Sequence, residues 1–192
     1  MVEKSLNIIP NGLTEKYEVL IIEDDIILNR AVERSLTNLG YNCKSFSGGA
    51  EFTSFASKPR GAKRPLLLLD YLLPDMDAFQ LLSELKSMDI DWPFIVMTGY
   101  GDEKTAVELM KLGAIDYIIK DDLLIKHLSK TIYQAIQKIE ITEKLELSRQ
   151  ELFYTAEKLR ELNKQINNQK LELEKEKAKT DKLLYEIGRA HV

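Results

Sequence analysis

Up to about residue 120, short apolar runs alternate with segments in which apolar residues recur at helical spacing. The apolar runs cover residues 19–22, 41–46, 65–69, 93–97 and 117–119, and the helical segments cover residues 26–39, 49–56, 78–88 and 102–112. Gly40 and Gly113 mark two helix ends. Continuous apolar runs are typical of strands buried on both faces, and strand–helix alternation favours right-handed crossovers. The pattern therefore predicts an α/β fold, a doubly wound five-stranded parallel sheet.

The remainder of the chain predicts one long helix, because residues 123–186 contain neither Pro nor Gly. Residues suited to a heptad seam recur there at spacings of three and four: Ile132, Ala135, Ile139, Thr142, Leu145, Leu152, Leu159, Leu162, Ile166, Leu173 and Leu183. The seam slips in phase once, near residues 142–145. Such a stripe is too narrow for burial in a core. It favours a parallel dimeric coiled coil over a single solvated helix stabilised by Glu–Lys pairs.

Polar residues follow four of the apolar runs: Glu23 and Asp24, then Asp70, then Thr98, then Lys120. In an open parallel sheet, ligands bind outside the carboxyl ends of the strands, so we expect these side chains to share one pocket. Oxygen ligands suit Mg2+, and an Asp carboxylate can act as a nucleophile toward a phosphoryl group. Lys120 and Thr98 can then contact the phosphoryl oxygens.

Each of these residues alone also has an ordinary structural interpretation. The acids of residues 23–25 could stabilise a helix start, and Asp70 could cap a turn. Thr98 could be a loop residue and Lys120 a surface charge. Their joint occurrence at the ends of the first, third, fourth and fifth runs favours the shared pocket.

Four segments resemble the motifs of a two-component response-regulator receiver domain. They are Val19-Leu-Ile-Ile-Glu-Asp-Asp25, Leu66-Leu-Leu-Leu-Asp-Tyr-Leu-Leu-Pro-Asp-Met-Asp77, Met97-Thr-Gly-Tyr-Gly-Asp102 and Gly113-Ala-Ile-Asp-Tyr-Ile-Ile-Lys120. The resemblance covers residues 17–130 and implies a flavodoxin-like fold. Two departures are Asp121, where the family usually has proline, and Ala78, where it usually has glycine.

The resemblance also implies a role for each matching residue. Asp70 is expected to be the phosphoacceptor, and Lys120 pairs with the phosphate. Mg2+ is expected to bind Asp24, Asp70 and the backbone carbonyl of Leu72, with Glu23 reaching the metal through water. Thr98 and Tyr117 are the expected switch residues, Thr98 moving toward the phosphoryl group and the Tyr117 ring turning into the space it leaves.

Function follows from this resemblance as an expectation. The chain would be a response regulator that receives a phosphoryl group from a sensor histidine kinase or phosphotransfer protein, and would not itself be an enzyme. A homodimeric coiled coil would carry the change to an output domain. An alternative is a stand-alone receiver and coiled-coil adaptor for protein–protein interaction. A Mg2+-dependent phosphatase is disfavoured, because its second Asp would stand where Leu72 stands.

The two ends of the chain carry their own expectations. Residues 1–16 predict a loosely held leader. Ile187-Gly-Arg-Ala-His-Val192 breaks the heptad pattern and matches one translated frame of a common sequencing adapter, so we expect it to be non-native. Residues 171–185 resemble the signalling helix of class III nucleotide cyclases, which favours a cyclase output over phosphatase, diguanylate cyclase or histidine kinase outputs.

Composition narrows the remaining function classes. The chain has 192 residues, 30% of them charged, with a net charge of −4. An acidic chain with no helix-turn-helix after residue 130 is not expected to bind nucleic acid. No stretch is long and apolar enough to predict a membrane span, and residues 1–12 lack the layout of a secretory signal. The single cysteine, Cys43, fits a reducing compartment, so we expect a cytoplasmic protein.

Overall fold

The computed structural model describes residues 12–59, 61–99 and 103–189. It divides the chain into two compact units, Met1–Glu140 and Ile141–Val192. Each unit is considered by itself.

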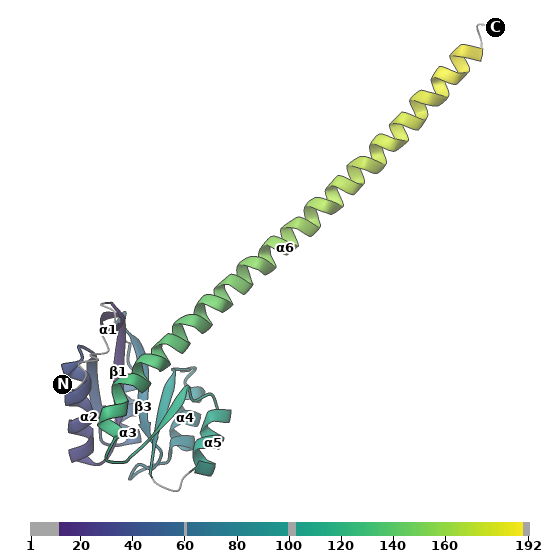
Figure 1. Cartoon of the computed structure of the whole chain (residues 1–192). Coiled ribbons are helices and arrows are strands. Elements are labelled where there is room, and N and C mark those ends of the chain that lie inside the picture. Colours follow the sequence, from purple (N-terminus) through teal and green to yellow (C-terminus); the bar gives the residue numbers. More distant parts are fainter. Residues whose placement is uncertain (1–11, 60, 100–102, 190–192) are drawn as a thin grey trace, which may run out of the picture. The chain divides into compact units, whose positions relative to one another are not determined.

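The first unit is built on a parallel sheet (Figure 1). Its five strands lie in the order β2-β1-β3-β4-β5. The strands are β1 (Tyr17–Ile22), β2 (Asn42–Phe46), β3 (Arg64–Asp70), β4 (Phe94–Thr98) and β5 (Asp116–Ile119). The helices are α1 (Leu13–Lys16), α2 (Ile26–Asn38), α3 (Gly49–Ala56), α4 (Ala78–Ser87), α5 (Glu103–Lys111) and α6 (Leu124–Arg189). The predicted doubly wound α/β fold is therefore confirmed, and this strand order is the flavodoxin-like one.

Helices cover both faces of the sheet, and each face has its own apolar core. One core joins alternate residues of the strands to α2 and the start of α6, including Val19, Val32 and Leu128. The other joins the opposite faces of the same strands to α3, α4 and α5, including Leu20 and Phe52. Since both faces of β1, β3 and β4 are buried, these strands are continuous apolar runs in the sequence.

The first turns of α6 belong to this core and not to a coiled coil. Leu124, Leu128, Ile132, Ala135 and Ile136 are almost fully buried against the sheet. The assignment of Ile132 and Ala135 to the heptad seam was therefore wrong, because their side chains already pack within their own domain. The phase slip near residues 142–145 follows directly after this buried stretch.

The end of the expected leader is folded. Residues Leu13–Lys16 form the short helix α1, and Leu13 packs against the core. Lys16 forms an ion pair with Glu140, whose Oε1 atom also accepts a hydrogen bond from the Tyr17 hydroxyl at 2.9 Å. Residues 1–11 lie outside the described part of the chain.

The second unit is the rest of α6, and the large apolar side chains described in it are exposed. The helix continues to Arg189, three residues beyond the end expected from the heptad pattern. Ala190 to Val192, at the end of the expected foreign tail, lie outside the described residues. Among the residues that the structure describes, none of the helices combines the length and hydrophobicity needed to cross a bilayer.

Candidate functional site

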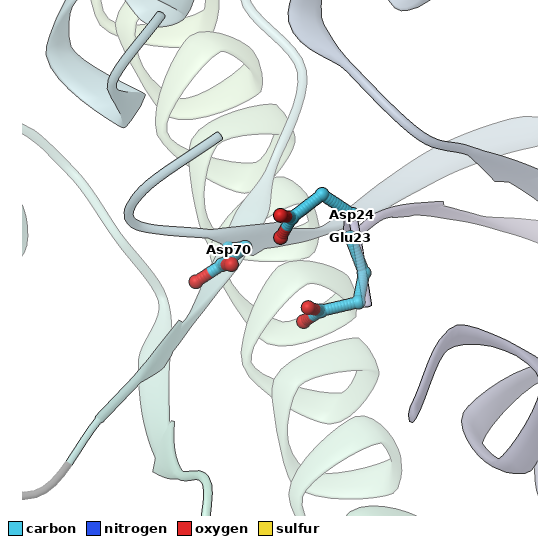
Figure 2. A group of neighbouring side chains, drawn as sticks. All are labelled: Glu23, Asp24 and Asp70. Atoms are coloured by element: carbon cyan, nitrogen blue, oxygen red, sulfur yellow. The ribbon is translucent and has the colours of Figure 1, made fainter. Parts of the chain in front are cut away.

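The ends of β1 and β3 bring three carboxylates together. The two strands are adjacent and in register up to Ile22 and Leu69, so the next residues, Glu23 and Asp70, follow side by side. Oxygen atoms of Glu23, Asp24 and Asp70 all lie within 4.8 Å of one another. Figure 2 shows the three carboxylates at this edge of the sheet. This is the point where the strand order reverses, the usual ligand position in such folds.

The acid next in the sequence, Asp25, has a different task. Its carboxylate accepts hydrogen bonds from the backbone of Ile27 at 2.8 Å and Leu28 at 3.2 Å, which caps the start of α2. The interpretation of residues 23–25 as helix-start acids thus holds for Asp25. Glu23 and Asp24 come before this cap and therefore lie outside α2.

A buried asparagine holds the backbone of the pocket in place. The Asn29 side chain donates hydrogen bonds to the carbonyl oxygens of Glu23 at 2.7 Å and Phe46 at 3.2 Å. Glu23 N donates to the same Phe46 oxygen at 3.0 Å. Asn29 therefore ties the end of β1 to the end of β2, a role that sequence analysis missed. The available signal was a lone amide in the buried stripe of α2.

Lys120 provides the positive charge of the site. Its Nζ atom lies 2.6 Å from Asp70 Oδ2 and 2.7 Å from Glu23 Oε2. The Lys120 backbone N–H donates to the Thr98 carbonyl at 2.8 Å, which continues the β4–β5 ladder and fixes the start of the side chain. The structure thus brings together the residues predicted at the ends of β1, β3 and β5.

Burial and charge shift the ionisation of these groups. Burial is the largest influence on Glu23 and on Asp70, and it raises the pKa of each carboxyl although Lys120 opposes the shift. Burial also lowers the pKa of Lys120, but its hydrogen bonds and charge interactions with Asp70 and Glu23 outweigh this effect and raise that pKa overall. When all three carboxyls are ionised, they carry three negative charges against the one positive charge of Lys120, so two charges are left without compensation from it.

This donor set fits a hard divalent cation. All the ligand atoms are carboxylate oxygens, two of the three acids are buried, and the uncompensated charge equals that of Mg2+. A zinc site would be expected to include nitrogen or sulfur ligands.

Comparison with known proteins assigns this arrangement to a family. Residues 19–133 match the response regulator receiver domain. The chain belongs to that family. The receiver resembles the transcriptional regulatory protein FixJ of Rhizobium meliloti (strain 1021), with 36% identity over 104 residues. It also resembles the transcriptional regulatory protein ZraR of Klebsiella oxytoca, with 30% identity over 129 residues.

The matches cover one part of each protein. The FixJ match spans 54% of this chain and 50% of FixJ, and the ZraR match spans 67% and 28%. Among solved structures, the crystal structure of FixJ-N has 33% identity and a TM-score of 0.54, covering 63% of this chain and 94% of that one. These relatives are named as regulators of transcription and not as enzymes.

The two departures from the receiver pattern are accommodated locally. Ala78 is fully buried as the first residue of α4, and its backbone N–H donates to the Tyr71 carbonyl at 2.9 Å. Its φ angle is not positive, so glycine is not required there. Asp121 donates its backbone N–H to Ile119 at 3.0 Å and accepts from Leu123 N at 2.9 Å. A proline at position 121 would have no N–H group and could not make the first of these bonds. With Asp121 in place of proline, Lys120 still reaches Asp70.

The two predicted switch residues occupy neighbouring strands of the receiver. Thr98 ends β4 and is almost fully buried, one residue beyond the partner of Asp70 in the sheet. Tyr117 lies on the edge strand β5, and 45% of its surface is exposed. Thr98 and Tyr117 therefore differ sharply in burial.

Proposed function

We propose that this chain is a phosphoacceptor response regulator in which Asp70 receives a phosphoryl group. The observation that carries the proposal is the position of the Lys120 ammonium, within 2.7 Å of both Asp70 and Glu23 at the switch point of the sheet. Phosphoryl transfer depends more on charge neutralisation and alignment than on a general base. Lys120 is suited to pair with the oxygens of the incoming group because it already neutralises Asp70.

In the proposed reaction, an Asp70 carboxylate oxygen attacks phosphorus in a phosphohistidine or an acyl phosphate. The bond from phosphorus to the donor nitrogen or oxygen breaks, and its electron pair leaves with the donor. Asp70 then carries an acyl phosphate. The Thr98 hydroxyl is assigned a hydrogen bond to one phosphoryl oxygen, and Lys120 an ion pair with another.

Glu23, Asp24 and Asp70 are the side chains that would hold Mg2+, with the Leu72 carbonyl as a backbone ligand and Glu23 acting through water. When bound, the ion supplies positive charge that the transferring phosphoryl group needs. Support comes from the oxygen-only donor set and from its two uncompensated charges. Asp25 has no place in this set, since its carboxylate caps α2.

The surface beside the pocket supports a protein as phosphoryl donor. Ile26 and Ile27, which follow the three acids after β1, have exposed fractions of 62% and 83%. Leu72, two residues after Asp70, has 66% of its surface exposed. Large exposed apolar side chains near a reactive pocket favour docking of a protein partner, here a sensor histidine kinase or phosphotransfer protein.

Labelling with acetyl phosphate tests the phosphoacceptor role. Wild-type protein with Mg2+ is expected to gain the mass of one phosphoryl group, and Asp70→Asn is expected to gain none. Asp25→Asn is the matched control, because Asp25 neighbours the pocket but caps a helix. It should be labelled like the wild type. Mg2+-dependent labelling of Asp70→Asn at the wild-type level would reject Asp70 as the acceptor.

We also propose that phosphorylation is transmitted through a dimer of the α6 segment beyond Glu140. In this proposal Thr98 moves toward the phosphoryl group and Tyr117 turns inward, which changes the face formed by α5, β5 and α6. Support comes from the exposed stripe Leu145, Leu152, Leu159, Ile166 and Leu173, which repeats every seven residues. The resemblance of residues 171–185 to a signalling helix favours a nucleotide cyclase as output.

The stand-alone adaptor remains the alternative to a linked output. The two proposals differ in what phosphorylation changes, namely the activity of a linked cyclase or the capture of a separate protein. Cyclase assays on the full reading frame with Asp70 wild type and Asp70→Asn distinguish them. Equal cyclase activity in both proteins under phosphorylating conditions would reject the linked-cyclase proposal.

A further inference from the structure

Asp75 connects the loop that follows Asp70 to the start of α3, a helix distant from it in the sequence. Its carboxylate oxygens accept hydrogen bonds from the backbone N–H groups of Gly49 at 3.0 Å and Ala50 at 2.8 Å. These amides open α3, where the backbone N–H groups lack helical partners. The bonds from Ala50 and Gly49 lower the pKa of Asp75, so the carboxylate is ionised at neutral pH. Asp75 thus binds the start of α3 from 26 residues away.

Two glycines allow this close approach. A Cβ atom on Gly48 would lie 3.2 Å from both carboxylate oxygens of Asp75. A Cβ atom on Gly49 would lie 2.3 Å from Met76 Sδ and 2.5 Å from Met76 Cγ, closer than nonbonded atoms tolerate. A side chain at Gly49 would therefore collide with Met76, and one at Gly48 would crowd Asp75; neither glycine has a positive φ angle.

The loop between β3 and α4 is otherwise closed on itself. Leu72 and Asp77 form an isolated antiparallel bridge, and Leu73 N donates to the Met76 carbonyl at 3.1 Å. Asp77 caps α4 through Gln80 N at 2.8 Å. The loop is thus fastened to β3 and α4 at its base, and the Asp75 bonds fasten its tip to α3.

This loop contains a backbone atom of the proposed site. The Leu72 carbonyl is the one proposed Mg2+ ligand that is not a side chain, so no rotamer change can correct its position. The Leu72 backbone N–H also bonds to Asp70 and lowers the pKa of that carboxyl, against the larger effect of burial. Movement of the loop tip would therefore displace both the Leu72 carbonyl oxygen and the Leu72 N–H group that bonds to Asp70.

We infer that Asp75 is a positioning residue, whose two bonds to the start of α3 hold the Leu72 backbone where the metal and the phosphoacceptor need it. The inference rests on the proposed function, because it assumes that the acidic pocket binds Mg2+. It adds a determinant of metal affinity that lies outside the acidic cluster.

Asp75→Ala, made in the full chain, tests the inference with two readouts. Without metal, hydrogen exchange should quicken at the Gly49 and Ala50 amides and at Leu73 and Ala78. The dissociation constant for Mg2+, measured by titration calorimetry, should rise on the order of 10-fold, as for the loss of groups that orient ligands. Asp75→Asn keeps one acceptor oxygen and should fall between alanine and wild type.

Val32→Ala is the control for a general loss of stability. Val32 is buried in the core on the opposite face of the sheet, so its truncation should lower the free energy of unfolding without changing Mg2+ affinity. An equal rise of the Mg2+ dissociation constant in Val32→Ala and Asp75→Ala would show a merely structural effect and overturn the inference. Wild-type Mg2+ affinity in Asp75→Ala would overturn it as well.

Gly49→Ala tests the same contact from the other side. The new methyl group should push Met76 and the loop away and weaken Mg2+ binding. The double variant Gly49→Ala/Met76→Ala removes the colliding atoms and should recover most of the affinity. If the double variant binds as poorly as the single variant, the loop position does not control the site. Failure of the wild type to bind Mg2+ would instead reject the proposed function.

Discussion

Lys120 Nζ lies 2.6 Å from Asp70 Oδ2, so an ammonium from the end of β5 neutralises a carboxylate at the end of β3. The same ammonium lies 2.7 Å from Glu23 Oε2. Both carboxylates are buried, whereas the Lys120 side chain is 21% exposed. The Lys120 ammonium therefore stabilises the ionised forms of Glu23 and Asp70, which could not both be ionised in this pocket without a positive charge nearby.

Lys120→Met should destabilise the protein in the absence of metal. Removing one partner of a buried ion pair leaves an uncompensated charge, which costs about 3 kcal/mol. The expected result is a free energy of unfolding lower by roughly that amount, measured by urea denaturation at pH 7 with a chelator present. Adding Glu23→Gln removes one of the two orphaned charges and should restore part of the loss. Equal stability of wild type and Lys120→Met would contradict the ion-pair network.

The raised pKa values of Glu23 and Asp70 predict how stability depends on pH. Their ordinary values are 4.5 and 3.8, and both are raised in the folded protein. The folded state therefore keeps protons that the unfolded state has lost. The stability from these groups is fully present below about pH 4 and is lost as pH rises through the raised values. Metal-free protein should become less stable from pH 4.5 upward on account of these two acids.

Mg2+ should oppose this trend, because it binds ionised carboxylates in the folded state alone. Urea denaturation at several pH values, with chelator or with Mg2+, measures both effects. The stabilisation by Mg2+ should grow with pH. Glu23→Gln/Asp70→Asn removes the two shifted groups and is the control, and it should show neither the pH slope assigned to them nor the gain from Mg2+. A pH slope unchanged in this double variant would contradict the assignment.

The strand-end residues were predictable because their signal is local. Asp70, Thr98 and Lys120 each end a short apolar run, and a parallel sheet brings the carboxyl ends of such runs to one edge. Asn29 and Asp75 were missed because their partners include backbone groups remote in sequence, Phe46 for Asn29 and Gly49 for Asp75. An amide or carboxylate of this kind has no pattern that distinguishes it from a surface residue until the fold is known.

Helix ends illustrate the same limit. α2, α4 and α5 all finish in a Schellman motif, with paired bonds such as Ile90 N to the Leu85 carbonyl at 2.9 Å and Asp89 N to the Lys86 carbonyl at 3.1 Å. Gly40 and Gly113 occupy the left-handed position in two of these motifs and were recognised from the sequence. In α4 that position is taken by Asp89, with a φ angle of 60°, which no composition rule identifies.

Backbone strain at Asp89 can therefore be tested with two substitutions that should change the stability of the protein in opposite directions. Glycine adopts the left-handed region freely, so Asp89→Gly should stabilise the protein by about 0.5 kcal/mol. Asp89→Ala keeps the Cβ atom but loses the local hydrogen bonding of aspartate, and should destabilise by about 1 kcal/mol. Thermal or urea denaturation of both variants measures the difference. Stabilisation by alanine would contradict the account of strain.

The heptad pattern combined two different signals, because apolar residues of α6 are buried in the first part of the helix and exposed in the rest. In the first part of α6, the apolar residues that pack on the sheet of their own domain are Leu124, Leu128, Ile132, Ala135 and Ile136, with Ile139 partly buried against them. Beyond Glu140 the apolar side chains described are exposed. A phase slip at the junction is expected when a helix changes what it packs against, since the spacing need not be maintained between two independent surfaces. The sequence alone does not distinguish this from a stutter within a coiled coil.

The exposed stripe predicts that the second unit mediates a dimer. Leu159 and Ile166 are separated by one heptad, and their exposed fractions are 56% and 51%. Glutamates at both positions would place like charges along the seam, so Leu159→Glu/Ile166→Glu should convert the dimer to a monomer. Sedimentation equilibrium of the full chain measures the change in mass.

Leucines outside the stripe provide the matched control. Leu147 and Leu171 have similar exposed fractions, 59% and 53%, but lie off the seven-residue repeat that contains Leu159 and Ile166. Leu147→Glu/Leu171→Glu adds the same charge to the same helix and should leave the dimer intact. If both pairs of substitutions dissociate the protein equally, added negative charge and not the seam is responsible. A wild-type chain that sediments as a monomer would reject the coiled-coil dimer and leave the exposed stripe free for a different protein.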